Sequence, residues 1–151
     1  MFKRIQIPDE GSRKAILGRQ LAVKRARQES EKPRGISVVD EFIAMQNFEA
    51  GFNTGDLIDA LKETGQRTIA NAQKLLKRHH RKVETTVLET VCKRVADVMV
   101  GDVANCKADL IAMDTHGRRG INRMVLGSDA KTTLRTSLAP VLMIRLPAHR
   151  G

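Results

Sequence analysis

A short apolar run followed by a glycine-rich segment constrains the fold of this chain more than any other feature. The run is Leu110–Met113, and the glycines that follow it end with Gly127. An apolar strand bounded by turns is typical of a parallel sheet that is covered on both faces. Ser128 and Asp129 come next and suit the first turn of a helix. Glycines let backbone N–H groups approach a ligand, and a helix N-terminus favours anions, so the segment predicts a phosphate-binding loop.

Extended and helical patterns alternate along the rest of the chain. Strands are expected at Phe2–Pro8, Ile36–Val39, Val83–Leu88, Asp109–Met113 and Pro140–Leu146. Helices are expected at Ser12–Ala26, Asp56–His79, Val91–Val103 and Gly127–Ser137, and Phe42–Asn53 is expected to be a loop. Such alternation requires crossover connections and a parallel sheet. We therefore expect an α/β fold, a doubly wound five-stranded parallel sheet with helices on both faces, forming a single domain over residues 1–151.

Length and cysteine usage indicate a cytoplasmic protein. The 151 residues suffice for one domain with a sizeable core. The stretch Met1–Ser12 carries charges and lacks the apolar region of a signal peptide, and no apolar run is long enough to span a membrane. Cys92 and Cys106, if both lie in the expected third helix, are about 21 Å apart and cannot form a disulfide. Free thiols are typical of a reducing compartment.

The charge balance favours anionic partners. The net charge is +10, from 27 Lys and Arg against 17 Asp and Glu. The chain has no Trp or Tyr and only 4 Phe, so platforms for base stacking are nearly absent. We therefore expect a solvated basic surface, with nucleic acid an unlikely partner. Direct association of this surface with nucleic acid is kept as a third and weaker hypothesis, and it predicts binding that depends steeply on salt. No catalytic residue and no metal site are expected, since His116 has no nucleophile beside it in the sequence and the adjacent His79 and His80 diverge on a helix.

Two segments with site-like residues follow expected strands. Pro8–Ser12 follows the first strand, and Asp114–Gly127 follows the fourth. In open parallel sheets, ligands bind beyond the carboxyl ends of the strands, near the point where strand order reverses. These two segments are therefore expected to meet at one ligand site.

Motifs in both halves of the chain are similar to those of one family. They are K-R-I-Q-I-P-D-E-G-S at Lys3–Ser12, S-V-V-D-E at Ser37–Glu41, D-L-I-A-M-D-T-H-G-R-R-G-I-N-R-M-V-L-G-S at Asp109–Ser128 and A-P-V-L-M-I-R at Ala139–Arg145. The chain thereby resembles the universal stress protein family along its whole length. The resemblance implies a doubly wound α/β domain, a homodimer formed by pairing of the last strands, and in some members ATP bound above the sheet.

The nucleotide-binding motif of that family is present with one position changed. The motif is glycine, two residues, glycine, nine residues, and then glycine followed by serine or threonine. Gly117 and the pair Gly127-Ser128 match it, but Asp114 stands where the first glycine belongs, and Glu10 stands for the usual aspartate. The resemblance implies nucleotide contacts at Pro8, Asp9, Glu10, Val38, Met113, Asp114, Thr115, His116 and Gly117, and phosphate contacts at Gly127, Ser128, Asp129 and Ala130.

Asp114 leaves two functions open. A carboxylate about 4 Å from a phosphate oxygen is repelled by on the order of 4 kcal/mol at an effective dielectric of about 20. Asp129 adds a second carboxylate, whereas Arg118, Arg119 and Arg123 in the same loop could neutralise both. The first hypothesis is a stress-response or signalling protein that binds ATP, with Mg²⁺ possible and at most slow, incidental hydrolysis. The alternative is a dimeric stress or scaffold protein that binds no nucleotide because of Asp114.

Overall fold

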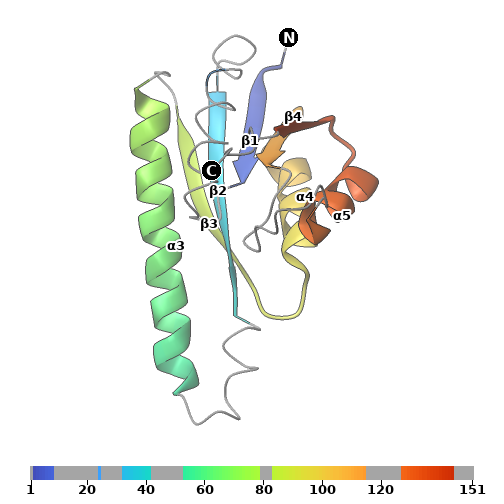
Figure 1. The fold of residues 1–151 in the computed structure, drawn as a ribbon. Coiled ribbons are helices and arrows are strands. Elements are labelled where there is room, and N and C mark those ends of the chain that lie inside the picture. Colours follow the sequence, from blue (N-terminus) through green and yellow to red (C-terminus); the bar gives the residue numbers. More distant parts are fainter. Residues whose placement is uncertain are drawn as a thin grey trace, which may run out of the picture.

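The computed structural model describes residues 2–8, 24, 32–41, 53–78, 83–114 and 127–144. Its strands form one five-stranded sheet in the order β3-β2-β1-β4-β5, and every pairing is parallel (Figure 1). The strands are β1 (Arg4–Pro8), β2 (Lys32–Asp40), β3 (Glu84–Thr90), β4 (Leu110–Asp114) and β5 (Val141–Ile144). The chain builds the sheet outward from β1, first through β2 to β3 and then through β4 to β5. Strand order therefore reverses between β1 and β4, which confirms the doubly wound parallel sheet.

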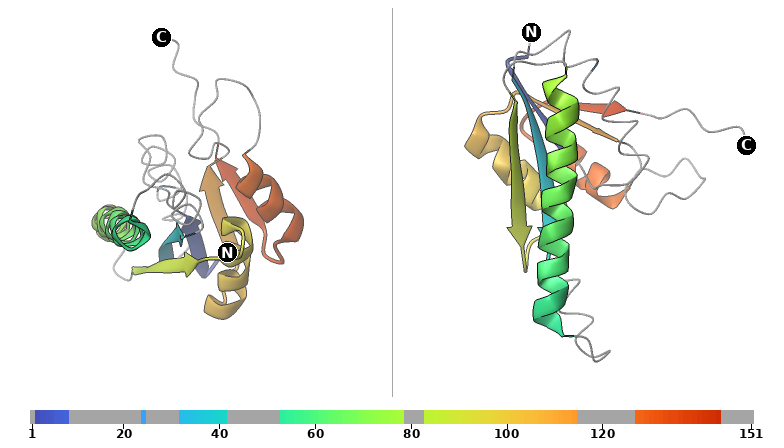
Figure 2. Two further views of the ribbon diagram at one scale, coloured as in Figure 1. Left: turned by 90° about the horizontal axis from the view of Figure 1, so that it is seen from below. Right: turned by 90° about the vertical axis from the view of Figure 1, so that its left-hand side faces the viewer.

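Helices cover both faces of the sheet, as predicted. The described helices are α3 (Thr54–Lys77), α4 (Val95–Cys106) and α5 (Ser128–Thr136). Figure 2 shows α3 on one side of the sheet and α4 and α5 on the other. None of these helices is a candidate membrane span; even α3, which has the length, is broken up by charged residues.

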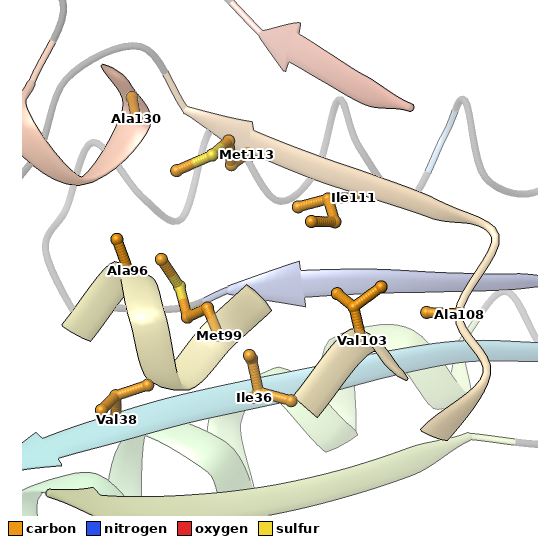
Figure 3. Close-up of a cluster of buried hydrophobic side chains, with 9 residues drawn as sticks. All are labelled: Ile36, Val38, Ala96, Met99, Val103, Ala108, Ile111, Met113 and Ala130. Atoms are coloured by element: carbon orange, nitrogen blue, oxygen red, sulfur yellow. The ribbon is translucent and has the colours of Figure 1, made fainter. Parts of the chain in front are cut away.

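The alternation of side chains along the strands divides the core into two layers. In β1, Ile5 and Ile7 pack in one buried cluster with Leu76 of α3. Gln6 lies between them on the other face, where its Nε2 donates to the main-chain oxygen of Met99 in α4 at 3.0 Å. The second cluster lies under α4 and α5 and comprises Ile36, Val38, Ala96, Met99, Val103, Ala108, Ile111, Met113 and Ala130 (Figure 3). A sheet buried on both faces accounts for the unbroken apolar run in β4.

Local signals set the helix ends. The side chain of Asn53 accepts the N–H groups of Gly55 and Asp56 and so caps the start of α3. Lys74 and Lys77 lie in its last turn, where cations stabilise the C-terminal end of the helix dipole. α4 ends at Lys107, which adopts the left-handed conformation with a φ of 56°.

The second strand begins earlier than the sequence pattern indicates. β2 starts at Lys32 rather than at Ile36, and it therefore contains Pro33. A proline is disfavoured inside a sheet because it donates no ladder hydrogen bond. Pro33 is nevertheless tolerated, because it pairs only with β1 and the register with β3 begins one residue later, at Arg34.

The third expected helix begins later, and this corrects the placement of one cysteine. α4 starts at Val95, so Cys92 lies in the connection after β3 and the two cysteines do not share a helix. The hydroxyl of Thr90 accepts the N–H of Lys93 and donates to its carbonyl, both at 3.0 Å, and so holds these residues in a turn. Both cysteines are nevertheless free thiols.

Two expected segments lie almost entirely outside the described residues. They are the helix at Ser12–Ala26, of which only Lys24 is described, as helical and exposed, and the loop at Phe42–Asn53, of which only Asn53 is described.

Candidate functional site

The carboxyl ends of β1 and β4 lie side by side at the point where strand order reverses. The two strands are hydrogen-bonded neighbours, with Ile5 opposite Leu110 and Gln6 opposite Ile111. β1 ends at the half-buried Pro8, and β4 ends at Asp114, whose backbone pairs with Ile144 of β5. This is the edge at which parallel α/β sheets bind their ligands.

The amino-terminal end of α5 lies at the same edge. Ala130, in its first turn, belongs to the same buried cluster as Met113, the penultimate residue of β4 (Figure 3). Gly127 is the N-cap, and its carbonyl accepts the N–H of Lys131 at 3.0 Å. The N–H groups of a first helical turn have no acceptor within the helix, and the dipole there favours an anion. The sequence brings Ser128, Asp129 and Ala130 to this position, as the predicted helix start requires.

Two of the predicted contact residues form the floor beneath this edge. Val38 and Met113 are 5% and 8% exposed, and both pack in the cluster under α4 and α5. Val38 lies on β2 beyond Ile36, which pairs with Pro8, so it too is near the carboxyl end of β1. Their burial leaves little side-chain surface for a ligand, and their established role is hydrophobic packing.

The remaining predicted site residues lie outside the described part of the chain. These are Asp9, Glu10, Thr115, His116 and Gly117, together with Arg118, Arg119 and Arg123 of the loop and the side chain of Asp114. The structure thus brings together Pro8, Val38, Met113, the backbone of Asp114 and the helix start at 127–130.

An ion-pair cluster that the sequence did not reveal lies at the same edge of the sheet, on the side of β3. Lys62 of α3 places its Nζ 3.5 Å from a carboxylate oxygen of Glu89 and 3.6 Å from one of Glu41. Glu89 first, and then Glu41, raise the pKa of Lys62 above its usual value of 10.5. The strand pattern alone places both glutamates at this edge, but the position of Lys62 depends on how α3 packs. The cluster ties α3 to the ends of β2 and β3.

Among the described residues, no three His, Cys, Asp or Glu side chains are grouped so as to hold a metal ion. Ser128 and Asp129 are exposed residues of the helix start, and Lys62 engages Glu41 and Glu89 at this edge. The described geometry suits the binding of an anion by main-chain groups rather than acid–base chemistry.

Comparison with known proteins agrees with this arrangement. The model of the universal stress protein family matches residues 1–145 of the chain. A similar curated protein is the universal stress protein MJ0531 of Methanocaldococcus jannaschii, which is 31% identical over 150 residues, or 97% of this chain and 84% of the relative.

Solved structures share the fold. The protein MJ0577 matches with a TM-score of 0.83 and 21% identity, over 98% of this chain and 99% of that chain. The universal stress protein from Archaeoglobus fulgidus, solved in complex with dAMP, matches with a TM-score of 0.63 and 16% identity, over 95% of this chain and 98% of that chain.

Proposed function

The chain belongs to the universal stress protein family, and from this premise we propose that it binds an adenine nucleotide at the carboxyl edge between β1 and β4. The proposed ligand is ATP, with Mg²⁺ as a possible companion, and the proposed role is stress response or signalling in the cytoplasm. Any hydrolysis is proposed to be slow and incidental, because the sequence places no nucleophile beside His116.

The observation that carries this proposal is the position of α5. Its first turn packs against the end of β4 through Ala130 and Met113, so its main-chain N–H groups lie beside the point where strand order reverses. The positive end of the helix dipole would stabilise the negative charge of phosphates bound at Gly127, Ser128, Asp129 and Ala130. The dAMP complex of the Archaeoglobus fulgidus protein supports an adenine nucleotide as the ligand class.

The other proposed contacts follow the edge. The adenosine would lie over Pro8 and Val38, with Asp9 and Glu10 directly after β1. Met113, Asp114, Thr115, His116 and Gly117 would line the end of β4.

The proposal is tested by equilibrium titration with labelled ATP, with and without Mg²⁺, and by native mass spectrometry of gently purified protein. We expect saturable binding, and the absence of binding at millimolar ATP would refute it.

A second candidate function follows from Asp114. Its backbone is in β4, in register with Ile144. The family resemblance puts the first glycine of the nucleotide-binding motif at this position, where the lack of a side chain would permit close approach. If this carboxylate excludes phosphate, the protein is a dimeric scaffold or signalling protein without a nucleotide.

Two substitutions at Asp114 separate the candidates. Asp114→Asn removes the charge and keeps the size of the side chain, whereas Asp114→Gly removes both. If repulsion of phosphate dominates, both variants should bind ATP at least about tenfold more tightly, since a factor of ten corresponds to about 1.4 kcal/mol. If close approach of the backbone dominates, only Asp114→Gly gains. Tight binding by the wild type that neither substitution changes would eliminate the second candidate.

A further inference from the structure

The opposite edge of the sheet, where the strands begin, carries a concentration of exposed cations. α3 runs antiparallel to the strands, so its last turn lies beside the starts of β1 and β2 (Figure 1). The end of α4 and the start of β4 lie at this edge as well. We call its exposed cations the basic edge, namely Lys3, Lys32, Lys74, Lys77, Arg78 and Lys107.

The acidic side chains at this edge are already engaged with other groups. Glu84 pairs with Arg4 at 2.9 Å and lies 3.7 Å from Arg34. Asp102 forms a salt bridge with Arg34. The carboxylate of Asp109 accepts the N–H groups of residues 3 and 4 at 2.7 and 2.9 Å. Arg4, Arg34 and main-chain N–H groups thus engage these three carboxylates.

Acidic residues gather instead at the carboxyl edge. Asp56, Asp97 and Asp129 lie in the first turns of α3, α4 and α5, and Glu41 and Glu89 lie at the ends of β2 and β3. Among the described residues, charge is therefore unevenly distributed between the two edges. A polyanion would be attracted to the basic edge.

Stabilisation of helix ends does not account for the basic edge as a whole. The dipole of α3 favours Lys74 and Lys77 in its last turn. It does not act on Lys3 and Lys32, which lie at the starts of strands. Lys107 occupies a left-handed position, with a φ of 56°, for which glycine is the usual residue.

The composition of this surface selects the kind of anion. Of its six cations all but one are lysines, which meet phosphates as point charges and do not read base edges bidentately. Base stacking on single strands requires aromatic side chains, and the chain has no Trp or Tyr. Insertion into lipid requires exposed apolar side chains. Among the described residues, the large ones lie after β3 and on the α5–β5 side of the sheet; they are Val91, Leu134, Leu138 and Leu142.

We infer that the basic edge binds the sugar–phosphate backbone of double-stranded nucleic acid without sequence preference. Five strands at about 4.8 Å spacing span roughly 20 Å, and a duplex presents one charge per about 1.7 Å of its axis. The edge therefore faces enough phosphates for several lysine contacts at once. The sequence makes nucleic acid an unlikely partner through its lack of aromatic residues, but that argument concerns single strands and does not apply to a duplex backbone.

The test uses the full-length protein without nucleotide and a fluorescent 30-base-pair DNA duplex, in two unrelated sequences, over a range of salt concentrations. About four to six phosphate contacts predict that log K falls against log salt with a slope of about −4 to −5. Lys74→Gln/Lys77→Gln should weaken binding roughly fivefold to tenfold per lysine at about 0.1 M salt and reduce the slope by about 2. Both sequences should bind equally well.

The matched control is Lys93→Gln/Arg94→Gln, which removes the same charge from exposed positions at the carboxyl edge. We expect it to bind the duplex as the wild type does. Equal losses in the two variants would show a general charge effect and overturn the assignment. So would salt-insensitive binding, no binding at low salt, or tighter binding to vesicles with anionic lipid or to polyglutamate than to the duplex. Because no nucleotide is present, a negative result leaves the proposed ATP site untouched.

Discussion

Two helical glycines show how differently one residue type can act in this fold. A Cβ built on Gly65 of α3 would lie 2.8 Å from Cγ2 of Val39 and 3.4 Å from Cγ1 of Val87, whereas a Cβ on Gly101 of α4 has nothing within 4 Å. Gly65 therefore sets how closely α3 approaches β2 and β3. Gly101 packs against nothing and only weakens the helix.

Alanine at these two positions should change stability in opposite directions. Gly101→Ala should stabilise the protein by about 0.5–1 kcal/mol, because alanine is the better helix former and loses less entropy on folding. Gly65→Ala gains the same helix propensity, but its added methyl group overpacks the rigid β-branched side chain of Val39 at a cost of about 1–3 kcal/mol. The net effect should be destabilising by about 1 kcal/mol. Urea unfolding of both variants measures the difference.

A third variant identifies the cause at Gly65. In the Val39→Ala background the clash is absent, so Gly65→Ala should cost less there than in the wild type. An unchanged cost would mean that overpacking against Val39 is not the reason.

At the scale of elements, the contact between α4 and β2 depends on an ion pair that is nearly buried. Arg34 and Asp102 have side-chain exposures of 13% and 10%. Asp102→Asn leaves the guanidinium without its nearest carboxylate, and Glu84, at 3.7 Å, compensates only in part. We expect a loss of about 2 kcal/mol, below the roughly 3–5 kcal/mol typical of a fully buried pair.

The same pair should be replaceable as a unit. Arg34→Met/Asp102→Leu should recover most of the stability that Asp102→Asn loses, because no uncompensated charge then remains. Thermal or urea unfolding of the single and double variants measures the coupling. A double variant no more stable than the single one would contradict the account.

The attachment of α3 to the carboxyl edge should depend on pH through Lys62. Its pKa in the folded protein is raised above 10.5 by Glu89 and Glu41. The contribution of the cluster to stability is therefore fully present below about pH 10.5 and is lost as the pH rises through the folded-state pKa. Wild type should be more stable than Lys62→Gln at neutral pH, and the difference should disappear in strongly alkaline buffer. A difference that stays constant with pH would exclude the ion pairs as its source.

The sequence specified the elements where burial and periodicity agree, and failed where tertiary pairing decides. The apolar run Leu110–Met113 and the helix start after Gly127 are as predicted, because each follows from local side-chain chemistry. The start of β2 was predicted too late because Pro33 and the charged residues on either side of it do not have the apolar pattern of a strand. They become one only because β1 offers a partner. The helix corresponding to α4 was predicted to begin too early, at Val91, because hydrophobic periodicity does not reveal the turn that Thr90 holds.

At the scale of the whole molecule, topology rather than any motif brings the candidate site together. Pro8 and Gly127 are far apart in the sequence, and only the reversal of strand order between β1 and β4 places their segments at one edge. Strand and helix alternation was enough to predict this meeting. The distribution of charge between the two edges could not be read in the same way. It depends on which ends of α3 and α4 lie beside which strand ends, and on the burial of Arg34 and Asp102 between them.

The remaining open edge of the sheet predicts an assembly. Among the described strands, β5 pairs only with β4. Leu142 on it is 38% exposed, and Leu138 just before it is 97% exposed. An exposed apolar edge strand is a site for pairing with another chain. We propose that two copies pair along β5, as the family resemblance implies.

Leu142→Lys should therefore shift the protein from dimer to monomer in analytical ultracentrifugation, because a charge at the pairing strand opposes its burial in the interface. Lys131→Glu, on an exposed position of α5, serves as a control for a change of charge nearby and should leave the dimer intact. If the wild type is already monomeric at high micromolar concentration, the edge is not an interface between copies. If Leu142→Lys remains dimeric, the copies meet through another surface. A monomeric Leu142→Lys variant that still binds the DNA duplex would show further that the basic edge acts within a single copy of the chain.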